Sequence, residues 1–87
     1  MTAKTALRKT QVRAIIQKIS WLKKSVAAGD YPKALACCYA IDVLAHRDNA
    51  FYRSVDRGVL FDYRAMDWAE VINRANHIYR QERECVA

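Results

Sequence analysis

Apolar residues in the first third of the chain recur at intervals of three and four positions, at Val12, Ile15, Ile16, Ile19, Leu22 and Val26. This spacing places them on one side of a helix with 3.6 residues per turn, and neither Gly nor Pro interrupts residues 5–28. Gly29 can adopt the left-handed conformation that ends a helix, and Lys23 and Lys24 suit the negative end of the helix dipole. The pattern predicts one amphipathic helix that ends near Gly29.

A second helix is predicted directly after that glycine. Asp30 can cap its N-terminus, and Pro32 falls in the first turn, where its missing N–H costs nothing. Every residue of 34–45 except Asp42 is apolar, which is typical of a helix buried on most of its circumference. We therefore expect this helix to be central, with the other segments packed around it.

Asp42 is the one charged residue within that apolar run. A carboxylate buried without a partner costs several kcal/mol, so it must be exposed, paired or functional. We expect it to mark a solvent-facing stripe, or to pair with an arginine such as Arg53 or Arg74. A catalytic carboxylate is the third alternative.

Residues 46–58 allow two interpretations. Asp48 or Asn49 can cap a short helix that carries Phe51 and ends at Gly58, or the second helix can continue to that glycine. The break is the preferred interpretation.

The last helix begins after Asp67. Glu70 three residues on completes a capping box, and Met66 can pack on Val71 as a hydrophobic staple. One apolar face follows, made of Trp68, Val71, Ile72, Ala75, Ile78 and Tyr79. Because no alternating strand pattern occurs, the sequence predicts an all-α protein, a small three- to four-helix bundle with a central apolar helix, in a single domain of residues 1–87.

The segment GDYPKALACCYAIDVL resembles the turn and second helix of a tetratricopeptide unit, through Gly29, Tyr31, Ala34 and Leu35. The resemblance covers about a fifth of the chain, and no second copy of the repeat occurs. It implies a helical hairpin and carries no implication about function.

Size and composition fit one small core. The chain has 87 residues, 53% of them hydrophobic, with two glycines and one proline, as expected of a helix-rich folded domain. No stretch approaches the ~20 apolar residues that span a bilayer, and the N-terminus lacks the pattern of a secretory signal. Three cysteines, of which Cys37 and Cys38 are neighbours, cannot form a disulfide framework. We expect a cytoplasmic protein with no membrane partner.

Motifs that carry chemistry are missing from the sequence. There is no glycine-rich phosphate loop, nucleophile elbow or Cys-x-x-Cys. The cysteines and the two histidines, His46 and His77, do not have the spacing of zinc ligands. We therefore expect no enzymatic activity, no cofactor and no metal site.

Positive charge is concentrated in the first third of the chain. The net charge is +6, and residues 1–29 hold seven basic residues and no acid, while the remaining residues sum to −1. A surface of one sign attracts polyanions and acidic proteins. The candidate binding residues on the first helix are Arg8, Lys9, Arg13, Lys18 and Lys24.

Trp21 lies among these cations. With 100° per residue, its side chain falls about 150° from the apolar stripe and faces outward, beside Gln17, Lys18, Lys24 and Ser25. An exposed aromatic on a basic helix is typical of a surface that stacks on bases or anchors a protein partner. The alternative is that another segment, near Phe61 and Tyr63, covers it.

A second candidate cluster follows residue 46. It combines Phe51, Tyr52 and Phe61 with the candidate binding residues Arg53, Arg57 and Tyr63. Arginine and tyrosine are enriched at interfaces. Acids lie among them, so internal salt bridges are the alternative. Homodimerisation through apolar surface around Phe51 and Phe61 is a further expectation for so small a core.

These features predict a small non-enzymatic regulator or inhibitor that binds an acidic protein face or a nucleoprotein. Small phage and mobile-element proteins act in this style, which is an analogy only. The alternative is direct, largely non-sequence-specific binding of nucleic acid. Binding to a membrane surface ranks lowest, because the apolar face of the first helix is needed for the core.

Overall fold

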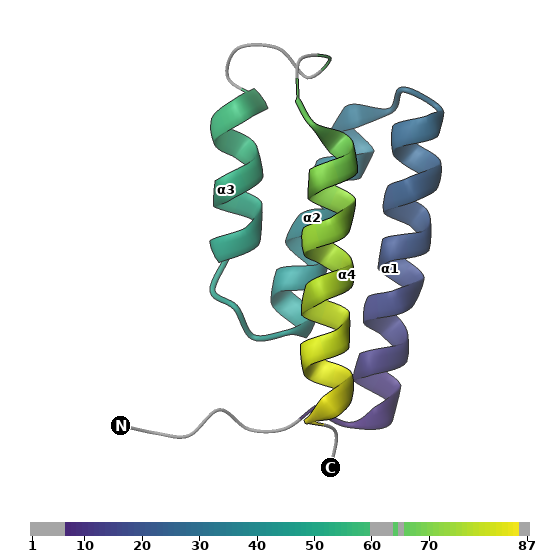
Figure 1. Ribbon diagram of the computed structural model, residues 1–87, viewed down its shortest axis with the longest axis vertical. Coiled ribbons are helices and arrows are strands. Elements are labelled where there is room, and N and C mark those ends of the chain that lie inside the picture. The colour runs from purple at the N-terminus through teal and green to yellow at the C-terminus, as the bar shows by residue number, and fades with distance from the viewer. Residues whose placement is uncertain (1–6, 60–63, 65, 86–87) are drawn as a thin grey trace.

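The computed structural model describes residues 7–59, 64 and 66–85, and the side chains of 56–59 are left out of the description. It contains four helices, α1 (Lys9–Ala27), α2 (Tyr31–Leu44), α3 (Ala50–Val59) and α4 (Trp68–Glu84), and the described residues form no strand. The helices run alternately up and down along one long axis (Figure 1). The prediction of an all-α bundle is confirmed, with four helices.

Local signals end and begin the helices as expected. Gly29 has φ = 73°, and it separates α1 from α2. Asp30 Oδ1 accepts the Lys33 N–H at 3.3 Å, and Asp67 Oδ1 accepts the Glu70 N–H at 3.1 Å. Both aspartates therefore act as the predicted N-caps of α2 and α4.

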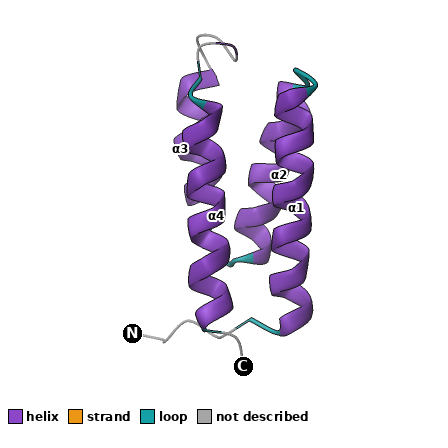
Figure 2. Ribbon diagram, turned by 45° about the vertical axis from the view of Figure 1, so that its right-hand side comes forward, coloured by secondary structure: helices purple, strands orange, loops and turns teal. Residues whose placement is uncertain are grey.

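The bundle is thin. α2 packs between α1 and α3, and α4 packs against α1. The helices form two layers, with α1 and α2 in one and α3 and α4 in the other (Figure 2). The Cα atoms extend over 38 × 27 × 16 Å, and a helix with its side chains is about 10 Å across. Only two helices fit across the short dimension, so no helix can be covered on every side.

The core lies between the layers. Its fully buried members include Ile15, Ile19 and Leu22 of α1 and Cys38 and Ile41 of α2. The predicted face of α4 also turns inward and contributes Trp68, Val71, Ala75 and Ile78. Trp68 stacks on Tyr31 with ring centroids 5.3 Å apart, which joins the first turns of α4 and α2.

Asp42 occupies a position that the sequence did not predict. It is fully buried, and its Oδ1 and Oδ2 accept the backbone N–H groups of Phe51 at 3.1 Å and Tyr52 at 2.6 Å. It therefore caps α3 from the neighbouring helix. The expectation that it faces solvent or pairs with Arg53 or Arg74 is wrong, because it is buried and both of its oxygens are bonded to N–H groups at the start of α3.

The loop between α2 and α3 is tightly wound. His46, Asp48 and Asn49 have positive φ values of 53°, 52° and 62°. The predicted break between the helices is confirmed, but the side chain that caps α3 is that of Asp42, and neither Asp48 nor Asn49 takes this role. The left-handed residues turn the chain back so that the first N–H groups of α3 reach Asp42.

Arg47 joins this loop to the last turns of α4, which end at the same end of the bundle (Figure 1). Its Nη2 donates to Gln81 Oε1 at 2.6 Å and lies 3.7 Å from Oε1 of the buried Glu82. Because a buried carboxylate needs a compensating charge, this contact helps to hold the last turn of α4 beside the α2–α3 loop.

α2 is less enclosed than its composition suggests. Its buried arc contains Ala34, Leu35, Cys37, Cys38, Ile41 and Asp42. On the opposite arc Tyr39 is 48% exposed and Val43 is 53% exposed. The expectation that α2 is buried on most of its circumference is therefore wrong, since the second layer of the bundle covers only one side of it.

Candidate binding surface around Trp21

The candidate surface is built on the second half of α1 and the first turn of α2. Trp21 is 41% exposed and turns away from the core, as its helical position predicts. The helix positions it because Leu22, the next residue, is fully buried and fixes the rotation of α1 about its axis. The indole is therefore presented to solvent by a rigid element.

A cation lies directly on the indole. Lys18 Nζ is 4.2 Å from the centroid of the Trp21 ring, which is a cation–π contact one helical turn apart. An exposed contact of this kind contributes about 0.5–1 kcal/mol and restricts both side chains. The surface thus presents an aromatic ring and a positive charge held close to each other.

Beside Trp21 lies a groove of about 400 Å³ between the end of α1 and the start of α2. Its lining residues are Trp21, Lys24, Ser25, Ala28, Asp30 and Lys33. Ser25 lies at the bottom, since it is buried and its Oγ donates to the Trp21 carbonyl at 2.8 Å. Its predicted place on the outward face is therefore wrong: the hydroxyl is satisfied by the helix backbone and turns inward.

The charge of this groove is positive. Lys24 and Lys33 line it, and Lys18 stands over the adjoining indole. The acidic residue in the lining is Asp30, whose carboxylate already accepts a backbone N–H at the start of α2. The groove thus presents cations that a negatively charged ligand could contact.

The other predicted residues are distributed differently. Arg8, Lys9 and Arg13 are exposed at the beginning of α1, and Arg53 is exposed on α3. None of these four lines the groove beside Trp21. Tyr63 lies outside the described residues, as does the side chain of Arg57. The structure therefore brings together Lys18, Trp21 and Lys24, with Lys33 added from α2.

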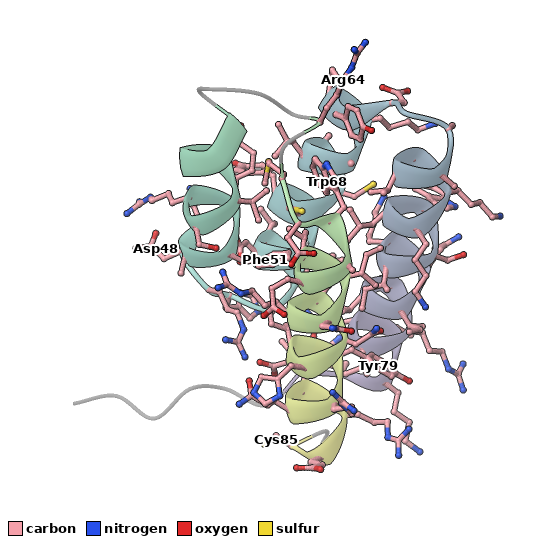
Figure 3. The ribbon with its side chains drawn as sticks, turned by 45° about the horizontal axis from the view of Figure 1, so that its top comes forward. Asp48, Phe51, Arg64, Trp68, Tyr79 and Cys85 are labelled. Atoms are coloured by element: carbon pink, nitrogen blue, oxygen red, sulfur yellow. The ribbon has the colours of Figure 1, made fainter. Side chains whose placement is uncertain are left out.

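Phe51 is not available as an interface residue. It is only 5% exposed and belongs to the core. Figure 3, in which the top of the bundle is tilted toward the viewer, labels it between α3 and α4. The expectation that it anchors a partner or a second copy is wrong, because the cap on its own N–H draws the first turn of α3 against α2. Phe61, the other member of that expectation, lies outside the described residues.

Sequence reasoning missed an apolar hollow on the outer side of α2. It has a volume of about 480 Å³ and is lined by Pro32, Leu35, Ala36, Tyr39 and Tyr52. The rings of Tyr39 and Tyr52 meet edge to face with centroids 5.7 Å apart. The helical positions of Ala36, Tyr39, Ala40 and Val43 on one arc could have shown that these residues share a face.

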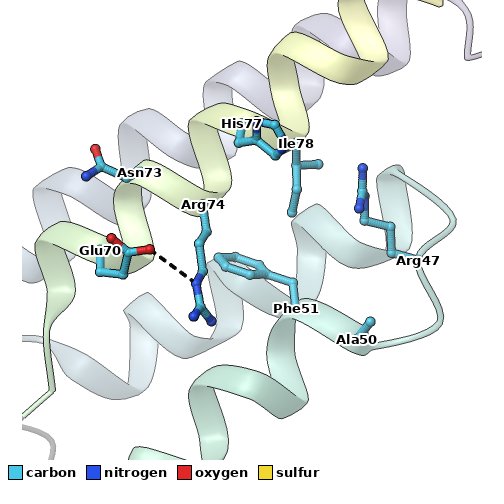
Figure 4. A pocket seen from close by; sticks show the side chains of 8 residues that line it. All are labelled: Arg47, Ala50, Phe51, Glu70, Asn73, Arg74, His77 and Ile78. Atoms are coloured by element: carbon cyan, nitrogen blue, oxygen red, sulfur yellow. Dashed lines mark ion pairs between the residues drawn. The ribbon is translucent and has the colours of Figure 1, made fainter.

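A third hollow, of about 460 Å³, separates α3 from α4 (Figure 4). Phe51 and Ile78 form its apolar part, and Arg47, Arg74 and His77 lie at its edges. Arg74 pairs with Glu70 at 3.5 Å, and Arg47 lies beside Glu82. Its cations are thus already matched by carboxylates, unlike the lysines around Trp21.

The thiols of α2 have the properties of core groups. Burial raises the pKa of Cys37 and raises that of Cys38 to about 12, with the neighbouring Cys37 and Asp42 adding to the latter. Both side chains therefore remain protonated near neutral pH and are poor nucleophiles.

The described part of the chain contains no group of three or more His, Cys, Asp or Glu side chains arranged to hold a metal ion. Within the same residues, none of the helices has the length and apolar character needed to cross a membrane.

Comparison with known proteins adds no relative. No protein-family model, curated protein or solved structure matches this chain. The candidate surface around Trp21 therefore stands on its geometry and charge.

Proposed function

We propose that this protein acts by binding, and that the surface around Trp21 docks on an acidic face of a larger protein or nucleoprotein, whose activity it thereby regulates or blocks. The observation that carries the proposal is the exposed indole under Lys18, at the edge of a groove that Lys24 and Lys33 line. Tryptophan anchors with a charged surround dominate binding energy at many interfaces. The lysines would mainly accelerate association with a negative partner.

Direct binding of nucleic acid is the second candidate function. Exposed Arg8, Lys9 and Arg13 continue the positive charge of α1 toward its N-terminus, and α1 spans about 28 Å at 1.5 Å per residue. Phosphate contacts along such a helix would make binding strongly dependent on salt. An exposed indole is also suited to stacking on an unpaired base.

Titration with two probes separates these functions. One probe is a helical peptide of about 20 residues with leucines on one face and glutamates on the other, a length that spans about 30 Å. The other is mixed-sequence single- and double-stranded DNA of similar length. Tryptophan emission reports binding at two salt concentrations, with Trp68→Phe as the background so that Trp21 alone emits.

The chain offers a matched pair of variants for this test. Lys24 lines the groove and Lys23, its neighbour, does not, although both are exposed on α1. We expect Trp21→Ala to weaken peptide binding about tenfold and Lys24→Gln to weaken it a few-fold, with Lys23→Gln near the unchanged protein. Binding of the Trp21→Ala variant is followed by calorimetry, since that variant lacks the fluorescent reporter.

Two results would contradict protein docking at this surface. Equal losses for Lys23→Gln and Lys24→Gln, with no effect of Trp21→Ala, would mean that the peptide responds to overall charge. Tight, salt-sensitive binding of DNA with no binding of the peptide would favour the second candidate function instead.

A further inference from the structure

The outer side of α2 forms an apolar face that the bundle leaves uncovered. It consists of Pro32, Ala36, Tyr39, Ala40 and Val43, and is called the open face below. Tyr39 and Val43 are about half exposed, although α2 otherwise contributes fully buried residues to the core. A helix that is apolar on all sides is normally enclosed, so an open side of this kind marks a contact surface.

The open face and the surface around Trp21 adjoin each other. Lys33 lines the groove beside Trp21, and its chain neighbour Pro32 lines the hollow beside Tyr39. Lys18 stands over Trp21, and its positive charge also opposes the rise in the pKa of Cys37. Cys37 lies one turn along α2 from Lys33, so Lys18 is close to this part of α2 as well. α2 is therefore a ridge with one hollow on its α1 side and another on its α3 side.

The shape of this surface fits a helix. The open face runs from residue 32 to residue 43, which is about 17 Å or three turns. A partner helix laid along it can place residues at i, i+3, i+4 and i+7 into the hollows on either side. Ala36 and Ala40 at the centre let two helix backbones approach closely, with the larger Tyr39 and Val43 at the side.

The positive charge beside the open face favours an acidic binding partner. Lys18, Lys24 and Lys33 border it on the α1 side, and the carboxylate of Asp30 on that side is engaged at the start of α2. A second copy of the chain would bring the same lysines and a net charge of +6. Like charges facing each other oppose association, so an acidic partner is favoured over self-association.

We propose that the open face of α2 binds an acidic amphipathic helix of the partner protein, with the apolar side of that helix against Tyr39 and Val43 and its carboxylates toward Lys18 and Lys33. This inference rests on the proposed function and names its partner chemistry. Nucleic acid is not the favoured occupant, because its bases could stack on Tyr39 but it has no aliphatic surface to cover Ala36, Ala40 and Val43.

The test uses the leucine–glutamate peptide described above with variants of the open face. Val43→Ser and Tyr39→Ala should each weaken binding about tenfold, because they remove apolar contact and leave every lysine in place. Ile16→Ser is the matched control: Ile16 is also an exposed aliphatic residue, at 37%, and it lies about 140° around α1 from Trp21. That variant should bind as the unchanged protein does. Circular dichroism of each variant confirms that it is folded.

The outcomes distinguish this inference from the proposed function. Loss of binding in Trp21→Ala and Lys24→Gln, with no loss in Val43→Ser or Tyr39→Ala, would retain docking at Trp21 and overturn the role of the open face. Equal weakening by Ile16→Ser would overturn it as well. A dimer in sedimentation that Val43→Ser abolishes would make a second copy the occupant and contradict the acidic partner.

Discussion

The two sides of α2 reverse the usual distribution of polar and apolar residues. The buried side holds the only carboxylate of the helix, fully enclosed, while the open face presents Tyr39 and Val43 to solvent. The buried carboxylate is satisfied by the backbone of α3, whereas Tyr39 and Val43 leave about half of their surface in water, and only Tyr39 has a described ring contact, with Tyr52. The first side maintains the fold, and the second is the side for which we propose a binding role.

Thiol reactivity should give the largest difference between the two sides. In a Cys37→Ala, Cys85→Ala background, an introduced Val43→Cys thiol should react with Ellman's reagent about a thousandfold faster than Cys38 near neutral pH, because Cys38 reacts only when the domain opens. The burial of Cys38 and its pKa of about 12 both slow the reaction of this thiol. The time course of thiol release measures both rates in one sample. Rates within tenfold of each other would mean that the buried side of α2 opens readily.

Removing the buried carboxylate should cost several kcal/mol. Asp42→Ala leaves the N–H groups of Phe51 and Tyr52 without their acceptors, and we expect a loss of about 2–4 kcal/mol in the free energy of unfolding. Urea denaturation measures it. Asp67→Ala, which removes an exposed cap from α4, serves as the comparison and should cost about 1 kcal/mol. A smaller loss for Asp42→Ala than for Asp67→Ala would refute the structural role of the buried carboxylate.

The ionisation of Asp42 should have a smaller effect, of defined sign. Burial raises its pKa, although the N–H groups of Tyr52 and Phe51 and the charge of Arg47 oppose the rise. A raised pKa in the folded state means that protonation favours folding, so this contribution is present in full below the ordinary aspartate pKa and is lost as pH rises through the raised value. The stability of the protein relative to Asp42→Asn should therefore fall with pH across that interval and level off above it. A stability difference that grows with pH would mean that the pKa of Asp42 is lowered in the folded protein, and would contradict this prediction.

The open face should tolerate change with the smallest effect on stability. Val43→Lys places a charge where the side chain is already 53% exposed, and we expect a change within about 0.5 kcal/mol in the free energy of unfolding. Ile41→Ala, two residues earlier on the buried side, should cost about 2–5 kcal/mol in the same urea experiment. If Val43→Lys were as costly as Ile41→Ala, the two sides of α2 would not differ as described.

Periodicity and capping allowed much of this fold to be predicted. The stripe of α1 follows from spacing except at Ile16, which was expected on it but is 37% exposed at its edge. The inward face of α4 also follows from spacing, and Asp30 and Asp67 act three residues from the N–H groups they cap. The outward direction of Trp21 follows from the same geometry. Signals of this kind lie within one helix or one turn, where residues that are close in the sequence are also close in space.

The unpredicted features depend on contacts between elements. Asp42 caps N–H groups nine and ten residues away on another helix, which no local motif indicates. α2 is apolar on all sides, so its pattern does not tell which side the other helices cover. The open face and the contribution of Lys33 to the groove beside Trp21 were missed for this reason.

The connection between α2 and α3 also restricts how this protein can be lengthened. α3 has ten residues, too few for a helix to persist in isolation, and its first N–H groups must meet a carboxylate fixed on α2. His46, Asp48 and Asn49 bridge that distance only through left-handed backbone, which β-branched residues adopt poorly. An insertion or deletion between residues 45 and 50 would carry α3 out of reach of its cap. Added sequence, such as a reporter loop, belongs elsewhere in the chain.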